Sequence, residues 1–213
     1  MSYAVKEMFL TLQGEGMQAG RRALFLRFAG CNLWTGREQD RAKAVCRFCD
    51  TDFVGTDGEN GGRFTDASSL AARAAWLWGD EPGARFIVVT GGEPMLQLDA
   101  ALVDALHEQG FDIAVESNGT LAATPGIDWL CISPKAGSAV VQRTGDELKL
   151  VWPQPGIEPA ALLDWDFGAY LVQPMDCGEP AANDAAREAA IALVMGDSRW
   201  RLSLQTHKLL GLK

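Results

Sequence analysis

The sequence predicts an α/β protein built around a parallel-stranded sheet or partial barrel of β/α repeats, with several crossover helices shortened or missing. Short apolar runs rich in β-branched residues recur along the chain, as is typical of buried parallel strands. Helical patterns fill only some of the gaps between these runs. Unusual polar residues follow the carboxyl end of one run after another.

Eight segments are predicted to be strands. The first is an N-terminal segment, and the other seven are the apolar runs: 3–12, 24–28, 86–90, 112–116, 129–133, 147–151, 169–173 and 201–205. The connections 117–128, 134–146 and 152–168 contain Gly and Pro and little helical pattern. They are just long enough for the dozen or so residues that a parallel crossover requires.

Three helices are predicted between the strands, at 66–78, 95–109 and 183–195. Thr65 or Asp66 could cap the first helix. The second follows Pro94, repeats leucine every four residues and stops at Gly110. The third is predicted to begin at Asn183.

Composition favours a single soluble domain spanning residues 1–213. The chain is 47% apolar and 22% charged, and no linker, apolar span or secretory signal is visible. Five cysteines, an odd number, argue against a disulfide framework and for a reducing cytoplasm. A net charge of −9 disfavours nucleic-acid binding, so a small-molecule substrate is expected.

The polar segments are expected to form one site, because the carboxyl ends of parallel strands open on one face. The segments in question are the cysteine loop, Thr90–Glu93, Glu116–Asn118, Ser133–Lys135, Gln173–Pro174 and Thr206–Lys208.

Cys31, Cys46 and Cys49 follow the strand predicted at 24–28. Three thiolates on one loop can hold a 4Fe–4S cube and leave one iron open. Zinc is the alternative, but a structural zinc site needs four ligands. The remaining candidates lack zinc-like spacing: Cys131, Cys177, His107 and His207.

Further residues carry weaker signals. Glycines in Thr90–Pro94 allow close backbone approach to a ligand, and Glu93 could hold an ammonium group. Arg27 and Lys135 could bind carboxylates, Arg27 in bidentate fashion. For Thr90–Pro94 the alternative is a plain strand-to-helix turn. For Arg27 and Lys135 the alternative is a satisfied salt bridge.

The chain resembles the 7-carboxy-7-deazaguanine synthase family of radical S-adenosylmethionine enzymes in queuosine (7-deazapurine) biosynthesis. The segments that carry the resemblance span most of the chain: 9–16, 27–34, 46–52, 90–94, 116–120, 132–135 and 171–176. Fourteen residues separate Cys31 from Cys46, whereas the wider superfamily usually has three. The resemblance implies a partial (β/α) barrel of radical S-adenosylmethionine type, with an expanded cluster-binding loop at 31–49.

The resemblance also implies residue roles. The cluster ligands would be Cys31, Cys46 and Cys49. The cofactor S-adenosylmethionine would contact Phe48, Gly91, Gly92, Glu93, Ser117, Ser133, Lys135, Gln173 and Asp176. The pterin substrate would contact Leu12, Gln13, Gly14, Glu15, Arg27, Thr90, Glu116 and His207. Thr51 would hold Mg²⁺.

The implied reaction is a radical ring contraction. Reduced cluster cleaves S-adenosylmethionine, and the resulting radical takes hydrogen from C6 of 6-carboxy-5,6,7,8-tetrahydropterin. Ammonia leaves, and 7-carboxy-7-deazaguanine forms. The expected partners are a flavodoxin or ferredoxin-type reductant and a second copy of the chain, in the cytoplasm. An activase for glycyl-radical enzymes, a ferredoxin-like carrier and a zinc-stabilised binding protein are the alternatives.

Two peripheral segments carry hypotheses of their own. Arg37, Arg41, Lys43 and Arg47 make the cluster loop locally basic, which would steer an acidic electron donor to it unless the loop is merely solvated. Residues 206–213 are expected to cross the site and close over the pterin, with a frayed terminus as the alternative.

Overall fold

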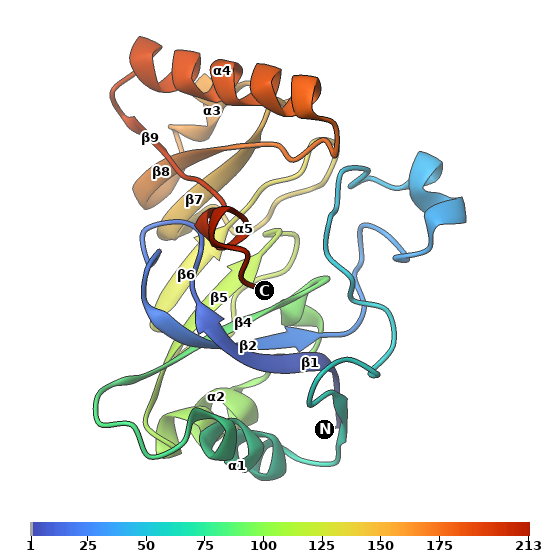
Figure 1. The fold of residues 1–213 in the computed structure, drawn as a ribbon, viewed down its shortest axis with the longest axis vertical. Coiled ribbons are helices and arrows are strands. Elements are labelled where there is room, and N and C mark those ends of the chain that lie inside the picture. Colours follow the sequence, from blue (N-terminus) through green and yellow to red (C-terminus); the bar gives the residue numbers. More distant parts are fainter. Residues whose placement is uncertain (1) are drawn as a thin grey trace.

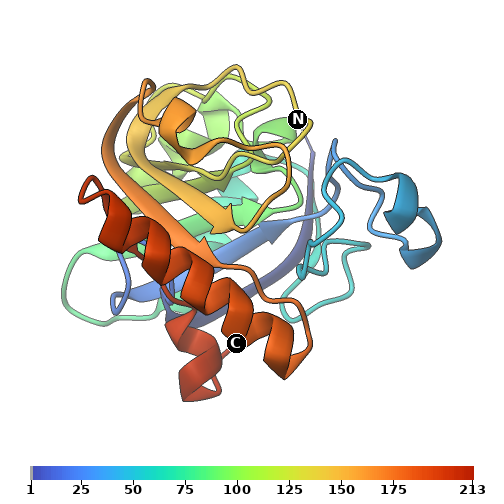
Figure 2. The ribbon, with the colours of Figure 1, turned by 90° about the horizontal axis from the view of Figure 1, so that it is seen from above.

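A curved, open sheet of nine strands forms the body of the computed structural model, which describes residues 2–213 (Figures 1 and 2). In chain order the strands are β1 (Tyr3–Leu12), β2 (Arg22–Phe28), β3 (Gly62–Phe64), β4 (Arg85–Gly91), β5 (Phe111–Ser117), β6 (Trp129–Ile132), β7 (Thr144–Trp152), β8 (Asp166–Pro174) and β9 (Trp200–Leu202). Their spatial order is β3-β1-β2-β4-β5-β6-β7-β8-β9. β2 and β4 to β9 pair in parallel, whereas β1 pairs antiparallel with β2 and β3. The sheet is therefore a partial barrel, as predicted.

Helices cover the convex side of this sheet unevenly (Figure 1). The longer ones are α1 (Ala67–Trp78), α2 (Ala100–Glu108) and α4 (Pro180–Gly196). The short ones are η1 (Glu38–Lys43), η2 (Pro94–Leu96), α3 (Pro159–Leu162) and α5 (Thr206–Leu210). Of these, η1 projects to the side of the sheet and α5 lies on its concave side (Figure 1). No helix joins β5 to β6 or β6 to β7, and a single turn joins β7 to β8. The prediction of shortened and missing crossover helices is confirmed.

Strand β2 shows how the sequence separates core from cavity. Leu24, Leu26 and Phe28 are fully buried in the hydrophobic core, whereas the alternate residues Phe25 and Arg27 line the concave side. Successive side chains of a strand point to opposite faces, so one strand supplies both surfaces.

The sequence misplaces two helix starts. The helix predicted from residue 95 begins only at Ala100. Glu93 accepts a hydrogen bond from Met95 N and caps the separate short helix η2. Asp99 caps α2 by accepting a hydrogen bond from Leu102 N, 3.0 Å away. The helix predicted from Asn183 begins instead at Pro180. The side-chain oxygen of Asn183 accepts a hydrogen bond from Cys177 N in the preceding loop, so Asn183 caps no helix start.

The end of the chain also differs from prediction. β9 stops at Leu202 rather than residue 205, because the Ser203 hydroxyl turns to Gln173 Oε1, 2.9 Å away. The short elements β3 and α5 were not predicted. Asp66 is the cap of α1, bonding Ser69 N at 2.8 Å. Within residues 2–213, no helix has both the length and the apolar character needed to cross a bilayer.

Candidate active site

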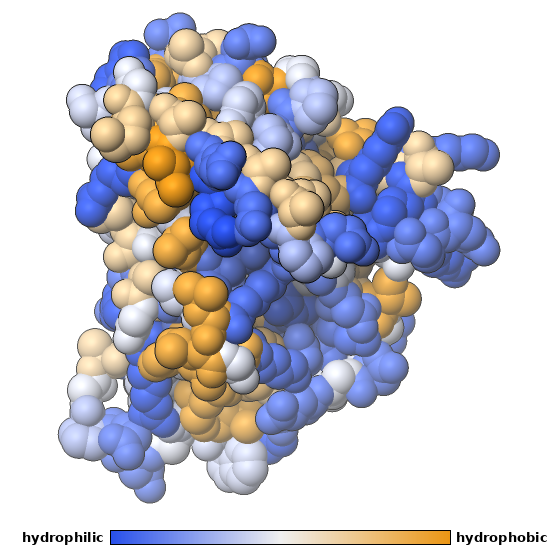
Figure 3. Space-filling model, turned by 45° about the horizontal axis from the view of Figure 1, so that its top comes forward, coloured by the Kyte–Doolittle hydropathy of each residue, from blue (hydrophilic) through white to orange (hydrophobic). Residues whose placement is uncertain are grey.

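A polar cavity of about 340 Å³ lies on the concave side, at the carboxyl ends of the parallel strands. Figure 3 shows a hydrophilic hollow on this face, with apolar surface beside it. The structure brings most of the predicted site residues to its wall: Leu12, Gln13, Gly14, Glu15, Arg27, Cys46, Phe48, Cys49, Thr51, Thr90, Gly91, Gly92, Glu116, Ser117, Ser133, Lys135, Gln173, Asp176 and His207. Cys31 and Glu93 are the two predicted site residues that do not line it.

The three cysteines of the 31–49 loop are free thiols beside this cavity. Cys46 and Cys49 line it and share a hydrogen bond, which lowers the pKa of Cys49 to about 6 and raises the pKa of Cys46. Cys31 packs against the glycine turn, Gly91–Gly92, at the end of β4. A Cβ on Gly92 would meet the Cys31 Cβ at 2.6 Å. Glycine is therefore needed there.

No three His, Cys, Asp or Glu side chains within residues 2–213 converge on a single-ion site. A 4Fe–4S cube does not require such convergence, because its ligands bind different irons. Three free thiols on one loop, two of them opening into a polar cavity, fit such a cube.

Glu93 is fully buried behind the wall. Burial raises the pKa of its carboxyl group, and hydrogen bonds oppose that rise: Ser117 Oγ and Asn118 N donate to it at 2.8 Å each. The carboxylate thus ties the glycine turn after β4 to the end of β5. In this structure the Glu93 carboxylate accepts hydrogen bonds from protein groups that hold the two strand ends together.

Lys135 lies on the cluster side of the cavity. Its Nζ donates to the Ser133 carbonyl at 2.9 Å and to Ser133 Oγ at 2.5 Å, and it lies 5.8 Å from the centroid of the Phe48 ring. Burial lowers the pKa of this ammonium group. Lys135, Ser133 and Phe48 therefore form one corner of the wall, next to Cys46 and Cys49.

Arg27 faces the cavity from β2, held by Glu7 of β1. The guanidinium Nε donates to Glu7 Oε1 at 2.9 Å, and Lys213 Nζ lies 2.7 Å from Glu7 Oε2. Among the described residues, no protein hydrogen bond uses the two terminal nitrogens of Arg27. The salt-bridge alternative and the carboxylate-binding prediction are therefore compatible, since the bridge uses only Nε.

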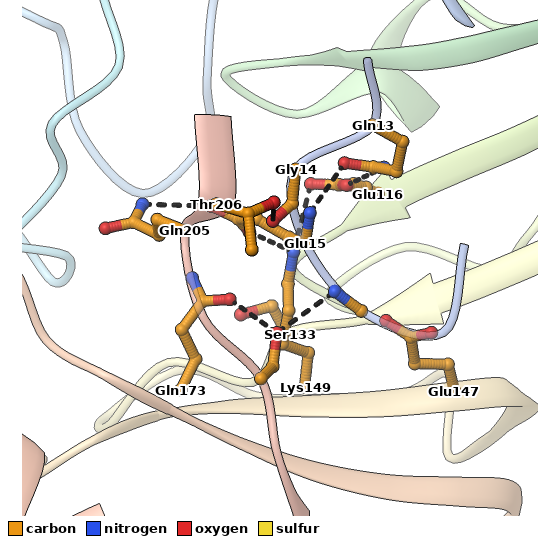
Figure 4. A network of polar contacts seen from close by, with 12 residues as sticks. Gln13, Gly14, Glu15, Glu116, Ser133, Glu147, Lys149, Gln173, Gln205 and Thr206 are labelled. Atoms are coloured by element: carbon orange, nitrogen blue, oxygen red, sulfur yellow. Dashed lines mark hydrogen bonds and ion pairs between the residues drawn. The ribbon is translucent and has the colours of Figure 1, made fainter. Parts of the chain in front are cut away.

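Buried charges line the opposite wall, where Lys149 of β7 contacts Glu15 and Glu116 (Figure 4). Sequence reasoning missed Lys149, although a lysine between Leu148 and Leu150 of an apolar strand was a usable signal. It also missed five other cavity-lining residues and Glu7: Phe9, Phe25, Val151, Met175 and Gln205.

The expanded loop folds back on itself through Arg41. The guanidinium donates to the carbonyl groups of Arg47 and Cys49, at 2.8 and 3.1 Å, and lies 4.1 Å from the Trp34 ring centroid. Trp34 in turn packs edge-on against Phe53. Arg41 is thus occupied in holding the cysteine segment, while Arg37, Lys43 and Arg47 are exposed.

The C-terminal segment crosses the cavity mouth. Lys208 Nζ bridges Asp50 and Asp176, at 2.8 and 2.6 Å, from two sides of the opening. Lys213 reaches β1, where Thr11 Oγ1 donates to its carbonyl at 3.0 Å. The predicted path of residues 206–213 across the site is therefore present in the structure.

Comparisons with known proteins identify the relatives of this chain. No protein-family model matches it. Proteins named 7-carboxy-7-deazaguanine synthase are 58% identical in Caulobacter vibrioides, 57% in Bordetella pertussis and 36% in Bacteroides thetaiotaomicron, each aligned over 100% of both chains. The crystal structure of QueE from Escherichia coli superimposes with a TM-score of 0.70 at 26% identity, covering 96% of this chain and 94% of that one. The chain belongs to the 7-carboxy-7-deazaguanine synthase family.

Proposed function

We propose that this protein converts 6-carboxy-5,6,7,8-tetrahydropterin to 7-carboxy-7-deazaguanine with loss of ammonia, as a carbon–nitrogen lyase of queuosine biosynthesis. The observation that carries the proposal is the opening of the cysteine loop into a cavity whose other walls hold Arg27, Glu15 and Glu116. Full-length relatives that bear the corresponding name support it.

Cys31, Cys46 and Cys49 would hold the 4Fe–4S cluster. S-adenosylmethionine would lie along the glycine turn and the Ser133–Lys135 corner: Phe48, Gly91, Gly92, Glu93, Ser117, Ser133, Lys135, Gln173 and Asp176. When bound, this pair supplies the one-electron chemistry that removes a hydrogen atom from the substrate. The protein contributes position, charge and exclusion of water.

The substrate would lie between the two walls. The free nitrogens of Arg27 match a carboxylate. Leu12, Gln13, Gly14, Glu15, Thr90, Glu116 and His207 would contact the pterin ring. Thr51, which lines the cavity between Asp50 and Asp52, is proposed to hold Mg²⁺, as the family resemblance implies.

An anaerobic assay tests the proposal. Reconstituted protein, dithionite, S-adenosylmethionine, Mg²⁺ and the carboxytetrahydropterin should yield 7-carboxy-7-deazaguanine, identified by mass. Omitting Mg²⁺ should lower the yield. Cofactor cleavage that ignores the pterin would contradict the proposal and favour an activase.

We also propose that residues 1–213 act as one domain, located in the cytoplasm. One continuous sheet supports the single domain.

The domain is further proposed to form a homodimer, which is the last of these proposals. Exposed leucines near the mouth support the last: Leu10, Leu12, Leu209, Leu210 and Leu212. Sedimentation analysis of the wild-type protein and of Leu209→Asp should show a dimer that the substitution weakens; a wild-type monomer would reject it.

The cluster assignment predicts three essential cysteines. Cys31→Ala, Cys46→Ala and Cys49→Ala should each lose iron and all cofactor cleavage, because two thiolates do not retain an open cube. Iron content and the visible spectrum measure this. Cys177→Ala and Cys131→Ala are the controls and should keep the cluster. Normal cleavage by any triplet variant would reject the assignment.

Arg27→Lys should weaken pterin binding by about tenfold, because it keeps the charge and loses the planar fork. Binding of S-adenosylmethionine should change little. Anaerobic equilibrium binding of each ligand separates the two effects, with Glu7→Gln as a milder control that keeps an acceptor oxygen. Equal losses for both ligands would mean that Arg27 is only structural.

The exposed basic residues of the cluster loop are proposed to dock an acidic reductant such as flavodoxin or a ferredoxin. Arg37→Gln/Lys43→Gln should slow flavodoxin-driven turnover at low salt and leave dithionite-driven turnover unchanged. Arg41 is left intact because it holds the loop. Arg187→Gln/Arg201→Gln, on the distant α4 and β9, is the charge-matched control. Unchanged flavodoxin-driven rates would indicate a solvated loop.

The C-terminal segment is proposed to close over the pterin. Deleting Leu209–Lys213 removes the ion pair of Lys213 with Glu7, so pterin binding should weaken and uncoupled cofactor cleavage should rise. The cluster should stay intact by iron content. Met195→Ala, an exposed apolar residue of α4 that leaves the C-terminal segment whole, is the control. A truncated enzyme with wild-type kinetics would contradict the lid.

A further inference from the structure

Lys149 occupies a position where lysine is costly. It lies on β7 between Leu148 and Leu150, which are both fully buried, and its own side chain is 4% exposed. A buried ammonium group loses hydration and is retained only when it is paired. Lys149 is not among the residues proposed to contact the substrate or the cofactor.

Two carboxylates from distant parts of the chain provide the pairing. Lys149 Nζ donates to Glu15 Oε2, in the loop after β1, and lies 3.3 Å from Glu116 Oε2 at the end of β5. Lys149 therefore joins two segments that line the proposed pterin site.

Amides occupy the other oxygen of each carboxylate. Gln205 Nε2 donates to Glu15 Oε1 at 2.9 Å, and Gln13 Nε2 donates to Glu116 Oε1 at 2.9 Å. The result is one chain of contacts, Gln205–Glu15–Lys149–Glu116–Gln13, across the cavity wall (Figure 4). Each carboxylate is fixed from both ends.

The network fixes ionisation as well as position. Burial alone would raise the pKa of Glu15, but the charge and hydrogen bond of Lys149 bring it to about 2. The two carboxylates raise the pKa of Lys149 despite its burial. Glu15 and Lys149 are therefore both charged at neutral pH.

Other titratable groups face this network from the neighbouring elements: Cys131 on β6, Glu147 on β7, Lys135 after β6 and His207 on α5. Glu147 is occupied by Met17 N at 2.8 Å, and burial raises its pKa. Burial likewise keeps the Cys131 thiol protonated by raising its pKa. Lys149 is the group that directly bonds Glu15 and approaches Glu116.

We propose that Lys149 is a positioning residue that holds the side chains of Glu15 and Glu116 in place as hydrogen-bond acceptors, and so selects a substrate edge that presents N–H donors. An ionised carboxylate only accepts hydrogen bonds, whereas a protonated one presents an O–H donor. An amino-pyrimidinone edge, with neighbouring ring N–H and amino groups, has the matching pattern. The inference rests on the function proposed above and assigns the polarity of its binding site.

Lys149→Met, of similar length and without charge, is the test. Pterin affinity of the reconstituted holoenzyme at neutral pH should fall by about tenfold or more, while the affinity for S-adenosylmethionine stays within about twofold. Below neutrality the loss should grow. Without Lys149, the raising effect of burial on the pKa of Glu15 dominates. Glu15 then binds a proton at higher pH, and the protonated oxygen no longer accepts a hydrogen bond from the substrate.

The pH dependence separates positioning from packing. In Lys149→Met the acid limb of pterin binding should lie more than about one pH unit above that of the wild type. Leu148→Met, on the opposite face of the same strand, is the control and should keep the wild-type limb. Lys149→Arg restores a charge and should move the limb back towards the wild type. An unshifted limb in Lys149→Met would overturn the proposal.

The wild-type enzyme gives a second test that needs no Lys149 variant. The pKa of Glu15 is about 2. The affinity of the wild-type enzyme for the pterin should therefore be flat from about pH 8 to about pH 5.5, once ionisation of the pterin itself is subtracted. A protein-derived limb near neutrality that persists in His207→Gln, which lacks the imidazole at the cavity wall, would overturn the proposal. Failure of the proposed function is distinguishable, because the wild type would then show no saturable pterin binding at any pH.

Discussion

Parallel pairing of β2 with β4 and onward to β9 is the constraint on which the site depends. It brings the carboxyl ends of seven strands to one rim, where the residues that leave each strand line a common cavity. The antiparallel strand β1 adds residues from the other direction. Short or missing helices between β5 and β8 leave the rim unchanged, because strand pairing and not helix packing sets its position.

The cavity wall is built from charges that the chain neutralises for itself. Lys149 is paired with two carboxylates and Arg27 with Glu7. Behind the wall, Glu93 accepts hydrogen bonds from donors at the end of β5. Fixed charges and dipoles of this kind act strongly on a ligand because they need not reorganise when it binds. The polar contents of the site are thus arranged before any ligand arrives, with the free nitrogens of Arg27 left for the ligand.

Local patterns made most of the fold predictable. Apolar runs located seven of the strands, and Asp66 marked the start of α1. Helix starts were misplaced where a side chain bonded a loop, as Asn183 does. The pairing of Lys149 with Glu15 joins residues 134 positions apart, and no local pattern specifies such a contact. The unusual lysine was visible in the sequence, but its partners follow only from the curvature of the sheet.

Glu7 links two parts of the site that sequence reasoning treated separately. One carboxylate oxygen accepts from Arg27 Nε, and the other pairs with Lys213 at the end of the chain. The guanidinium and the C-terminal segment are thereby fixed by the same side chain. Movement of the segment away from β1 removes a positive charge from Glu7 and leaves that carboxylate to Arg27 alone. A more strongly held Arg27 has less positive potential to offer a ligand, so closure of the mouth and the strength of the carboxylate clamp are physically coupled.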